Sequence, residues 1–345
     1  MSSIILRHLL AFIFSFFSCF YLIPVVAHAA SLCGILDIPD GKIKCHDSPV
    51  PYLGGLAVFI SFIVSLALIY PFENKILWLL LGSTLLLLVG LIDDLKVLKP
   101  GHKFGGQVIA VLCFLKGGFS LRTLFFSSFI NLLLSAFWML SLINAFNLID
   151  VMDGLASLVA LVSAVVFLII ALLLKQFLIS LLLVAFIGSV CAFFLYNKPP
   201  AKIYLGDAGS MFLGGFLAAV PLLFSWSERS LYAHYAPLVI LAVPLLEVFF
   251  LIVIRTWNGL PFYKGSPHHF SVYLQKKGWT KYRVLFFALC MEILFSFFAV
   301  LFIFNYVSFF SLLISCCILL FIWCYVIFTP LIFKDKSSSL RENLN

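Results

Sequence analysis

Long apolar segments separated by short polar connections fill almost the whole chain. The clearest, residues 155–174 and 177–196, have about the 20 residues that an α-helix needs to cross a bilayer. Strands of a membrane barrel would instead be about 10 residues long and alternate in polarity, which these segments do not. We therefore predict an all-α, polytopic membrane bundle of about eleven transmembrane helices. The predicted spans are residues 4–27, 52–70, 76–92, 104–116, 128–143, 155–174, 177–196, 210–225, 235–255, 285–304 and 307–329.

The composition supports a membrane protein, because 64% of the 345 residues are hydrophobic and only 10% are charged. The net charge of +8 does not indicate nucleic-acid binding, since the cations are scattered between apolar segments rather than gathered in one groove. The nine cysteines form no metal-binding or disulfide pattern. We predict one transmembrane domain over residues 1–333, followed by a short polar tail over residues 334–345.

The N-terminal segment has two interpretations. Arg7, the apolar residues after it and the sequence Ala27-His28-Ala29 resemble a signal peptide with a small-residue cleavage site. We predict instead an uncleaved first span, because cleavage would remove a helix that the topology requires.

Lysine and arginine are distributed unevenly between the two sides of the predicted bundle. The connections after the first, third, fifth, seventh and ninth spans, together with the tail, hold 16 of the 22 cationic residues. Because cytoplasmic connections carry an excess of Lys and Arg, we place these connections and the C-terminus in the cytoplasm and the N-terminus outside. The polar motifs fall in the same connections, so we expect the cytoplasmic connections to form the active site.

Most acidic residues outside the tail follow apolar segments on this predicted cytoplasmic side. Carboxylates are costly beside hydrocarbon, and they are usually paired, metal-bound or functional. Asn144, Asn147, Asp150 and Asp153 are spaced three residues apart, which predicts a polar stripe at the end of a helix, with Gly154 after it. Helix caps and interhelical hydrogen bonds would explain one such residue, whereas four in register favour a functional site.

Two further acidic motifs fit metal and proton chemistry. Asp207 lies in the sequence Gly206-Asp207-Ala208-Gly209-Ser210, where a hard oxygen ligand on a turn suits Mg²⁺; an ordinary turn or a helix cap is the alternative. Asp93 and Asp94 are adjacent, and paired acids raise one another's proton affinity, which suits a general base. A helix end at the membrane interface is the alternative interpretation of this pair.

Adjacent histidines and two intramembrane acids complete the candidate groups. His268 and His269 can hold phosphates or assist proton transfer, whereas no third soft ligand supports a zinc site. Glu247, inside the ninth span, is expected to face the bundle interior, where structural pairing explains it at least as well as catalysis. Glu292, in the tenth span, is assigned no role.

In this order and on this many spans, the motifs resemble the polyprenyl-phosphate N-acetylhexosamine-1-phosphate transferase family. The resemblance implies a Mg²⁺-dependent enzyme of the bacterial inner membrane that transfers a HexNAc 1-phosphate, by default GlcNAc 1-phosphate, from a UDP-sugar to undecaprenyl phosphate and releases UMP. Such a reaction would begin a cell-envelope glycan, such as the O-antigen of lipopolysaccharide. The motifs that carry the resemblance are Pro51-x-x-Gly54-Gly55, Leu91-Ile92-Asp93-Asp94, Asn144-x-x-Asn147-x-x-Asp150-x-x-Asp153-Gly154-Leu155 and Gly206-Asp207-x-Gly209-Ser210.

The resemblance also implies roles for individual residues. Asp207, helped by Asn147, would bind Mg²⁺, for which Mn²⁺ could substitute. The residues expected to handle the lipid phosphate and the sugar pyrophosphate are Asp93, Asp94, Asp150, His268 and His269. The residues expected to contact the donor are Lys44, His46, Asn144, Asp153, Asn197, Tyr204 and Arg255. A homodimer is a further expectation from the family.

Two departures from the family pattern bear on the donor. The first connection reads Lys42-Ile43-Lys44-Cys45-His46, where many members have Arg-Lys-x-His. The sequence therefore does not identify which basic residue of this connection would contact the donor. Pro267-His268-His269-Phe270-Ser271 has two histidines and no Glu, whereas phospho-MurNAc-pentapeptide transferases usually carry three histidines before a Phe-Glu pair. The departures favour the GlcNAc-1-phosphate (WecA-like) branch, with the MurNAc-pentapeptide branch as the first alternative.

Two alternatives come from other functional classes. An ion-coupled transporter would use intramembrane acids, but it would place them near the middle of the spans and is often built from internal repeats. No such repeat is visible in the chain. A non-catalytic assembly subunit is the second alternative, but it would not need Asp207, Asp153 and Asp94 together.

Overall fold

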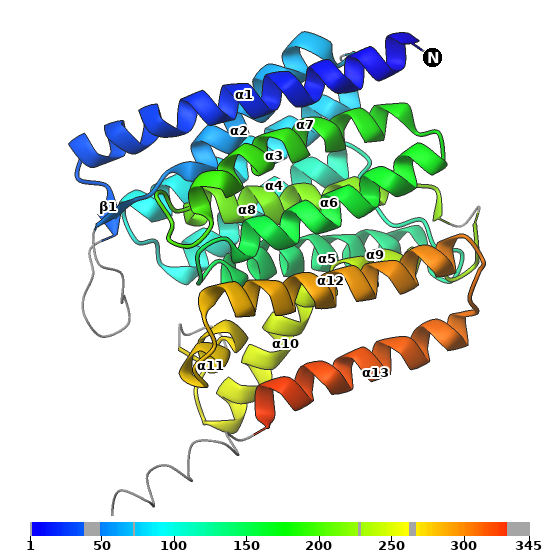
Figure 1. Cartoon of the computed structure of the whole chain (residues 1–345). Helices are drawn as coiled ribbons and strands as arrows, with labels where there is room; N and C mark the ends of the chain where they lie inside the picture. Colours follow the sequence, from blue (N-terminus) through cyan, green and yellow to red (C-terminus); the bar gives the residue numbers. More distant parts are fainter. Residues whose placement is uncertain (1, 38–48, 72, 227–228, 262–266, 330–345) are drawn as a thin grey trace, which may run out of the picture.

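Figure 1 shows a computed structural model of the chain, which describes residues 2–37, 49–71, 73–226, 229–261 and 267–329. The described chain is a bundle of helices, with one two-stranded antiparallel pairing among the described residues at one end. In chain order its elements are α1 (Ser2–Leu32), β1 (Leu36–Asp37), β2 (Val50–Pro51), α2 (Gly54–Ile69), α3 (Asn74–Leu95), α4 (Pro100–Lys116), α5 (Ser128–Ile149), α6 (Leu155–Leu173), α7 (Phe177–Asn197), α8 (Gly206–Ala219), η1 (Val220–Leu223), η3 (Ala233–Tyr235), α9 (Ala236–Ile240), α10 (Ala242–Trp257), α11 (Phe270–Lys276), α12 (Lys281–Ile303) and α13 (Phe309–Phe328).

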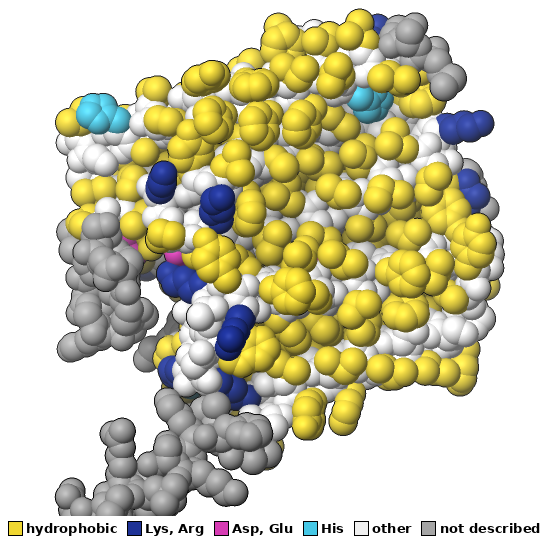
Figure 2. Space-filling view, in the orientation of Figure 1, with side chains coloured by type: hydrophobic (Ala, Val, Ile, Leu, Met, Phe, Trp, Pro, Cys, Tyr) yellow, Lys and Arg dark blue, Asp and Glu magenta, His cyan; other side chains and the backbone are white. Residues whose placement is uncertain are grey.

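The all-α membrane architecture is confirmed, whereas the number of spans is not. Each predicted span coincides with a helical segment, but only eight described helices are long and apolar enough to cross a membrane, or nine if one bent pair counts as a span. α2 and α4 are shorter, with 16 and 17 residues. Figure 2 shows hydrophobic side chains over the middle of one face, with Lys and Arg toward its two ends, as expected for a protein surrounded by lipid. The sidedness of the termini remains a prediction.

The helix α8 forms the centre of the bundle and packs against α2, α3 and α5. Phe216 of α8 stacks on Phe186 of α7 with ring centroids 4.2 Å apart, within a larger aromatic core. At Gly55, a Cβ atom would lie 2.1 Å from the Cα atom of Gly209, so α2 and α8 approach closely only because Gly55 has no side chain. This packing fixes the beginning of α8 at one end of the bundle.

The predicted span over residues 235–255 is broken in the structure, because α9 and α10 meet at a bend of 71°. Pro244 has no backbone N–H to donate to the carbonyl of Ile240, so a continuous helix loses a hydrogen bond at this point. Glu292 of α12 compensates, because one carboxylate oxygen accepts from the backbone N–H of Val243 (3.3 Å) and the other from the hydroxyl of Ser163 (2.5 Å). The buried Glu292 thus has a structural role that the sequence analysis did not assign.

The polar motifs gather at one end of the bundle. The end of α3, the beginning of α4, the end of α5, the beginnings of α6 and α8, and the segment around α11 lie at the end marked by β1 in Figure 1. Because successive helices run in opposite directions, motifs that are separated by up to about half of the sequence lie at the same end of the bundle.

Candidate active site

Asp207 is the one residue of α8 that is not buried. The helix begins at Gly206, before the predicted span over residues 210–225, so Asp207 lies in its first turn, with its side chain 32% exposed. The positive end of the helix dipole favours a carboxylate at this position. A buried central helix therefore presents a single anionic side chain at the polar end of the bundle.

Backbone hydrogen bonds between two motifs fix the position of Asp207. The N–H groups of Gly54 and Gly55 donate to the carbonyls of Tyr204 and Leu205, both at 2.9 Å. The N–H of Tyr204 in turn donates to the carbonyl of Pro51 at 2.9 Å. The motif Pro51-x-x-Gly54-Gly55 therefore holds the segment that leads into α8, rather than supplying reactive side chains.

Asp94 caps the beginning of α8. Its Oδ1 and Oδ2 atoms accept hydrogen bonds from the backbone N–H groups of Asp207 (2.8 Å) and Ala208 (3.1 Å), which have no partner inside the helix. The sequence left open whether Asp94 is a base or a helix end. In the structure Asp94 caps a helix end, and the capped residue, Asp207, is 113 residues away in the chain.

Gly206 is required by this cap, and its substitution tests the arrangement. Its φ of +73° is unfavourable for any residue with a side chain, and a Cβ atom would lie 2.6 Å from Oδ2 of Asp94. We expect Gly206→Ala to destabilise the protein by roughly 2 kcal/mol, measured by thermal unfolding in detergent. Gly105→Ala, on α4 with no atom within 4 Å of the added Cβ, is the matched control and should leave the melting temperature unchanged or raise it. Equal melting temperatures for the two variants would contradict the cap.

Lys103 of α4 contacts acids of two helices and an amide of a third. Its ammonium group lies 2.9 Å from Oδ2 of Asp93 and 3.1 Å from Oδ1 of Asn147, and it forms an ion pair with Asp207. Asn147 also donates from Nδ2 to Oδ1 of Asp207 at 2.7 Å. Burial lowers the pKa of Lys103, but the carboxylates of Asp207 and Asp93 raise it more, so the net pKa is raised and the amine stays charged. We call Asp93, Asp94, Lys103, Asn147 and Asp207 the carboxylate cluster.

The cluster offers hard oxygen ligands to a divalent cation. The described residues contain no group of three or more His, Cys, Asp or Glu side chains placed to enclose a metal. Mg²⁺ does not need such a group, because it keeps several waters and takes one or two carboxylates together with substrate phosphates. Asp207, with Asn147 beside it and Asp93 across Lys103, fits that ligand chemistry. These residues therefore suit a Mg²⁺ ion that a substrate phosphate would also bind.

Only two of the four polar residues in the predicted helical stripe lie on a helix. Asn144 and Asn147 lie on α5, but the helix ends at Ile149, and Asp150 and Asp153 follow in a turn. A φ of +75° at Gly154 separates this turn from α6. The spacing of three residues correctly placed Asn144 and Asn147 on a helix, but it could not show that this helix ends at Ile149.

Asp150 is the acid of this turn with no hydrogen bond or ion pair to any described residue. Burial raises the pKa of its carboxyl well above the ordinary value, and the negative charges of Asp207, Asp94 and Asp153 raise it further. Asp150 is therefore free to meet a ligand, in contrast to Asp153, whose Oδ2 accepts from Lys281 (2.8 Å) and from the N–H of Ala201 (3.2 Å).

Amide variants of these two acids should have opposite effects on stability. A folded-state pKa above the unfolded value means that Asp150 costs stability as pH rises from the ordinary aspartate range through the raised pKa. Asp150→Asn removes that cost, so its melting temperature near neutral pH should exceed the wild-type value and fall less with rising pH. Asp153→Asn breaks the contact with Lys281 and should lower stability by about 1–3 kcal/mol. Thermal unfolding from pH 5 to 8 in a chelator distinguishes the two, and a lower melting temperature for Asp150→Asn would contradict the assignment.

Asn144 and Asn197, which are predicted to contact the UDP-sugar, form hydrogen bonds within the protein. Asn144 and Gln107 of α4 exchange amide hydrogen bonds, the shorter at 2.9 Å. The side-chain oxygen of Asn197 accepts from the N–H of Gly154 (3.1 Å) and from Ser157 (3.0 Å), and its nitrogen donates to the carbonyl of Ile203 (3.0 Å). Asn197 thus shapes the turn beside the cluster, and its contact with the donor remains a prediction. Tyr204 lies beside Tyr52, with ring centroids 5.9 Å apart.

The histidine pair belongs to a second group on the same end of the bundle. Nδ1 of His269 lies 2.7 Å from Oε1 of the fully buried Glu247, whose Oε2 accepts from the N–H of Phe270 at 3.3 Å. His268 is half-buried, and Arg255 is buried on the helix of Glu247. α11 contacts the Asp150–Asp153 turn, since Nε2 of Gln275 lies 3.4 Å from the sulfur of Met152. No described hydrogen bond joins the histidines to the carboxylate cluster, and Lys44 and His46 lie outside the described residues.

Several residues of the site were not singled out from the sequence. The contacts of Lys103 with Asp93, Asn147 and Asp207 were not predicted, and Gln107 and Lys281 had no predicted role. Lys103 and Gln107 are four residues apart on a mostly apolar helix, and this spacing was the available signal that both lie on the same side of it. Their partners come from α3, α5 and α8, so the spacing alone did not identify them.

Comparison with known proteins gives a consistent result. Residues 76–225 match the family described as glycosyl transferase family 4. The chain is 30% identical over 276 residues, 76% of each chain, to a probable undecaprenyl-phosphate N-acetylglucosaminyl 1-phosphate transferase of Bacillus subtilis. It is 29% identical over 310 residues, 88% of this chain and 94% of the relative, to an undecaprenyl-phosphate alpha-N-acetylglucosaminyl 1-phosphate transferase of Thermotoga maritima. It is 31% identical over 275 residues, 71% of this chain and 82% of the relative, to a phospho-N-acetylmuramoyl-pentapeptide-transferase of Streptococcus pneumoniae.

Proposed function

The chain belongs to glycosyl transferase family 4, and from this premise we propose that it transfers N-acetylglucosamine 1-phosphate from UDP-GlcNAc to undecaprenyl phosphate. The products are undecaprenyl-pyrophosphoryl-GlcNAc and UMP, and the reaction begins a cell-envelope glycan. The observation that carries the proposal is Asp207, the one exposed residue of a buried central helix, surrounded by the other residues of the carboxylate cluster. The relatives named above are transferases, which leaves the transporter alternative without support.

The reaction exchanges one phosphorus–oxygen bond for another. An oxygen of the lipid phosphate forms a bond to the β-phosphorus of UDP-GlcNAc. The bond from that phosphorus to the oxygen bridging the α-phosphate breaks, and the bridging oxygen leaves with the electron pair as part of UMP. Such transfers depend on alignment and on neutralising charge rather than on an elaborate nucleophile.

Direct attack by the lipid phosphate fits the hydrogen bonding of the cluster better than an aspartyl intermediate does. Each oxygen of Asp94 accepts a backbone N–H, and those of Asp207 contact Asn147 and Lys103. Hydrogen bonds to a carboxylate stabilise its charge and make it a weaker nucleophile. Asp150, with its raised pKa and no described partner, is suited to accept a proton from the lipid phosphate or to donate one to a substrate oxygen.

The remaining groups of the site would hold the two substrates. Lys103 offsets part of the negative charge of Asp93 and Asp207, which reduces the repulsion of a pyrophosphate that approaches the cluster. Glu247 holds His269 by Nδ1, so that Nε2 of the ring is left to contact the sugar pyrophosphate. Mg²⁺, held by Asp207 and Asn147, would neutralise the pyrophosphate oxygens. The undecaprenyl tail would lie in lipid beside the apolar flank of the bundle.

Removal of divalent cations should separate activity from folding. We expect a chelator to abolish UMP release, and we expect Mg²⁺ to restore it fully and Mn²⁺ in part. The melting temperature should change little, because Lys103 already forms ion pairs with Asp93 and Asp207 without a metal. Full activity in the chelator would contradict the metal assignment.

The excess of Lys and Arg in the connections at this end supports an active site on the cytoplasmic side of a bacterial inner membrane. UDP-sugars are cytoplasmic metabolites in this scheme, so the donor and the cluster would lie on the same side. Labelling of single cysteines introduced in these connections, in intact cells, tests that orientation.

The donor is tested by a panel of UDP-sugars. Purified protein is supplied with undecaprenyl phosphate and Mg²⁺ and with UDP-GlcNAc, UDP-GalNAc or UDP-MurNAc-pentapeptide. The lipid product is then identified from its mass by mass spectrometry. We expect a GlcNAc-pyrophosphoryl lipid and no product from the pentapeptide donor. A product only with the pentapeptide donor would assign the chain to the function named for the Streptococcus relative, which is 31% identical.

A further inference from the structure

A second polar feature lies at the opposite end of the bundle from the carboxylate cluster. A cavity of about 240 Å³ lies between the beginning of α3, the connection from α4 to α5 and the segment after η1. Asp94 and Asp207 lie at the other ends of α3 and α8, so the cavity and the cluster are separated by the length of these helices. At ~30 Å³ per water molecule, the cavity has room for roughly eight waters, or for one phosphate headgroup.

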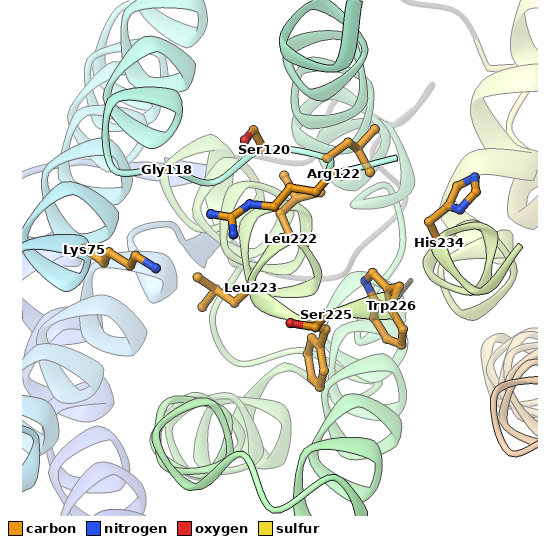
Figure 3. A pocket seen from close by; sticks show the side chains of 11 residues that line it. Lys75, Gly118, Ser120, Arg122, Leu222, Leu223, Ser225, Trp226 and His234 are labelled. Atoms are coloured by element: carbon orange, nitrogen blue, oxygen red, sulfur yellow. The ribbon is translucent and has the colours of Figure 1, made fainter. Parts of the chain in front are cut away.

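Two cations face this cavity from different parts of the chain. Figure 3 shows the charged ends of Lys75 and Arg122 directed into the same space, whereas the ring of His234 lies farther away. Neither Lys75 nor Arg122 makes an ion pair with a described residue. These are two of only six Lys and Arg residues assigned to this side of the bundle, so their convergence is not a consequence of a generally basic surface.

No carboxylate lines the cavity among the described residues. Glu73, next to α3, is the described acid at this end, and it is not part of the lining; Glu228 lies outside the described residues. Two cations in one recess, with no carboxylate among the described residues that line it, make its potential positive and favour an anion over a neutral or cationic ligand.

The other lining groups match a phosphate attached to an apolar molecule. The hydroxyls of Ser120 and Ser225 can donate hydrogen bonds to phosphate oxygens, and the planar guanidinium of Arg122 can donate two in parallel. Leu222 and Leu223 add apolar surface beside these donors. A guanidinium, an ammonium and hydroxyls next to apolar side chains at a membrane surface form the chemistry that binds a lipid phosphate.

We propose that this cavity is a phosphate-binding site, separate from the transferase site, that holds the headgroup phosphate of an anionic membrane lipid. Inorganic phosphate carries the same chemistry and is the other source of the ligand. The site does not depend on the proposed transfer reaction, because none of its residues belongs to the carboxylate cluster.

Native mass spectrometry of the delipidated full-length protein tests the proposal with three probes. They are dioleoyl phosphatidylglycerol, the zwitterionic dioleoyl phosphatidylcholine and inorganic phosphate. The test variant is Lys75→Gln/Arg122→Gln, and the matched control is Lys116→Gln/Lys175→Gln, which removes two exposed cations from the same end without touching the cavity lining. Arg122→Lys keeps the charge but loses the two parallel hydrogen bonds, and it serves if the double variant does not fold.

We expect phosphatidylglycerol to bind the wild type and the control variant equally, and the test variant roughly tenfold more weakly or worse. Phosphatidylcholine should bind more weakly than phosphatidylglycerol, and Arg122→Lys should give an intermediate affinity. Binding of inorganic phosphate instead of lipid, again lost in the test variant, would support the site with a soluble source. Equal affinities of the test and control variants for every probe would overturn the proposal.

Discussion

Asp207→Asn is expected to reduce UMP release by roughly a thousandfold while leaving the fold intact. The amide keeps the shape of the side chain and can still accept a hydrogen bond from Asn147, but it removes the charge that would bind Mg²⁺. The cap on α8 is unaffected, because Asp94 accepts from the backbone N–H of residue 207 and not from its side chain. Loss of a favourable charge at the helix beginning should cost only about 0.5 kcal/mol.

The measurement is UMP release together with thermal unfolding in the same detergent. Glu73→Gln makes the same chemical change on an exposed side chain at the other end of the bundle, and it should retain wild-type activity. An Asp207→Asn protein that unfolds at the wild-type temperature and retains more than about a tenth of the activity would show that Asp207 is not central to the transfer.

Lys103→Met should cause the second largest loss, about a hundredfold in activity and about 1–3 kcal/mol in stability. Methionine keeps most of the length and apolar volume of the side chain but removes the ammonium group between Asp93 and Asp207. The two carboxylates are then left without their cation, and an approaching pyrophosphate meets uncompensated negative charge. Part of the stability loss should be recovered by millimolar Mg²⁺, since a bound cation can take over the neutralisation.

Lys96→Met is the matched control for this substitution. Lys96 lies between α3 and α4, shortly before Lys103 in the chain, is exposed and makes no ion pair with a described residue. It should retain full activity and the wild-type melting temperature. If Lys103→Met resembles Lys96→Met in both activity and stability, the ion pairs of Lys103 do not support the site.

The sequence predicted the class of fold and several of the polar residues that lie together, but not how these residues contact one another. Asp207 and Asn147 were placed together from their motifs, and they are in contact. The cap from Asp94 to α8 was not predictable, because it depends on how α3 and α8 cross, and no local spacing records that crossing. The same holds for Lys103, whose three partners come from three different helices.

Local breaks in helices were missed for a different reason. Hydropathy follows apolar composition, and residues 235–255 are mostly apolar, so they were predicted as one span although Pro244 could have indicated the break. In the same way, the spacing of Asn144, Asn147, Asp150 and Asp153 extended the helix through residues that lie in a turn. The consequence for the site is that Asp150 lies outside the helix and has no hydrogen-bond or ion-pair partner among the described residues.

The most direct measurement uses UDP-GlcNAc labelled with radioactive phosphorus at the β-phosphate, together with undecaprenyl phosphate and the purified protein. Transfer of a sugar 1-phosphate predicts that the label moves into the lipid fraction as unlabelled UMP appears in equal amount, and that Asp207→Asn abolishes both. Label recovered in UDP would show that the sugar alone is transferred, and label that never leaves the donor would contradict a transferase that uses this substrate.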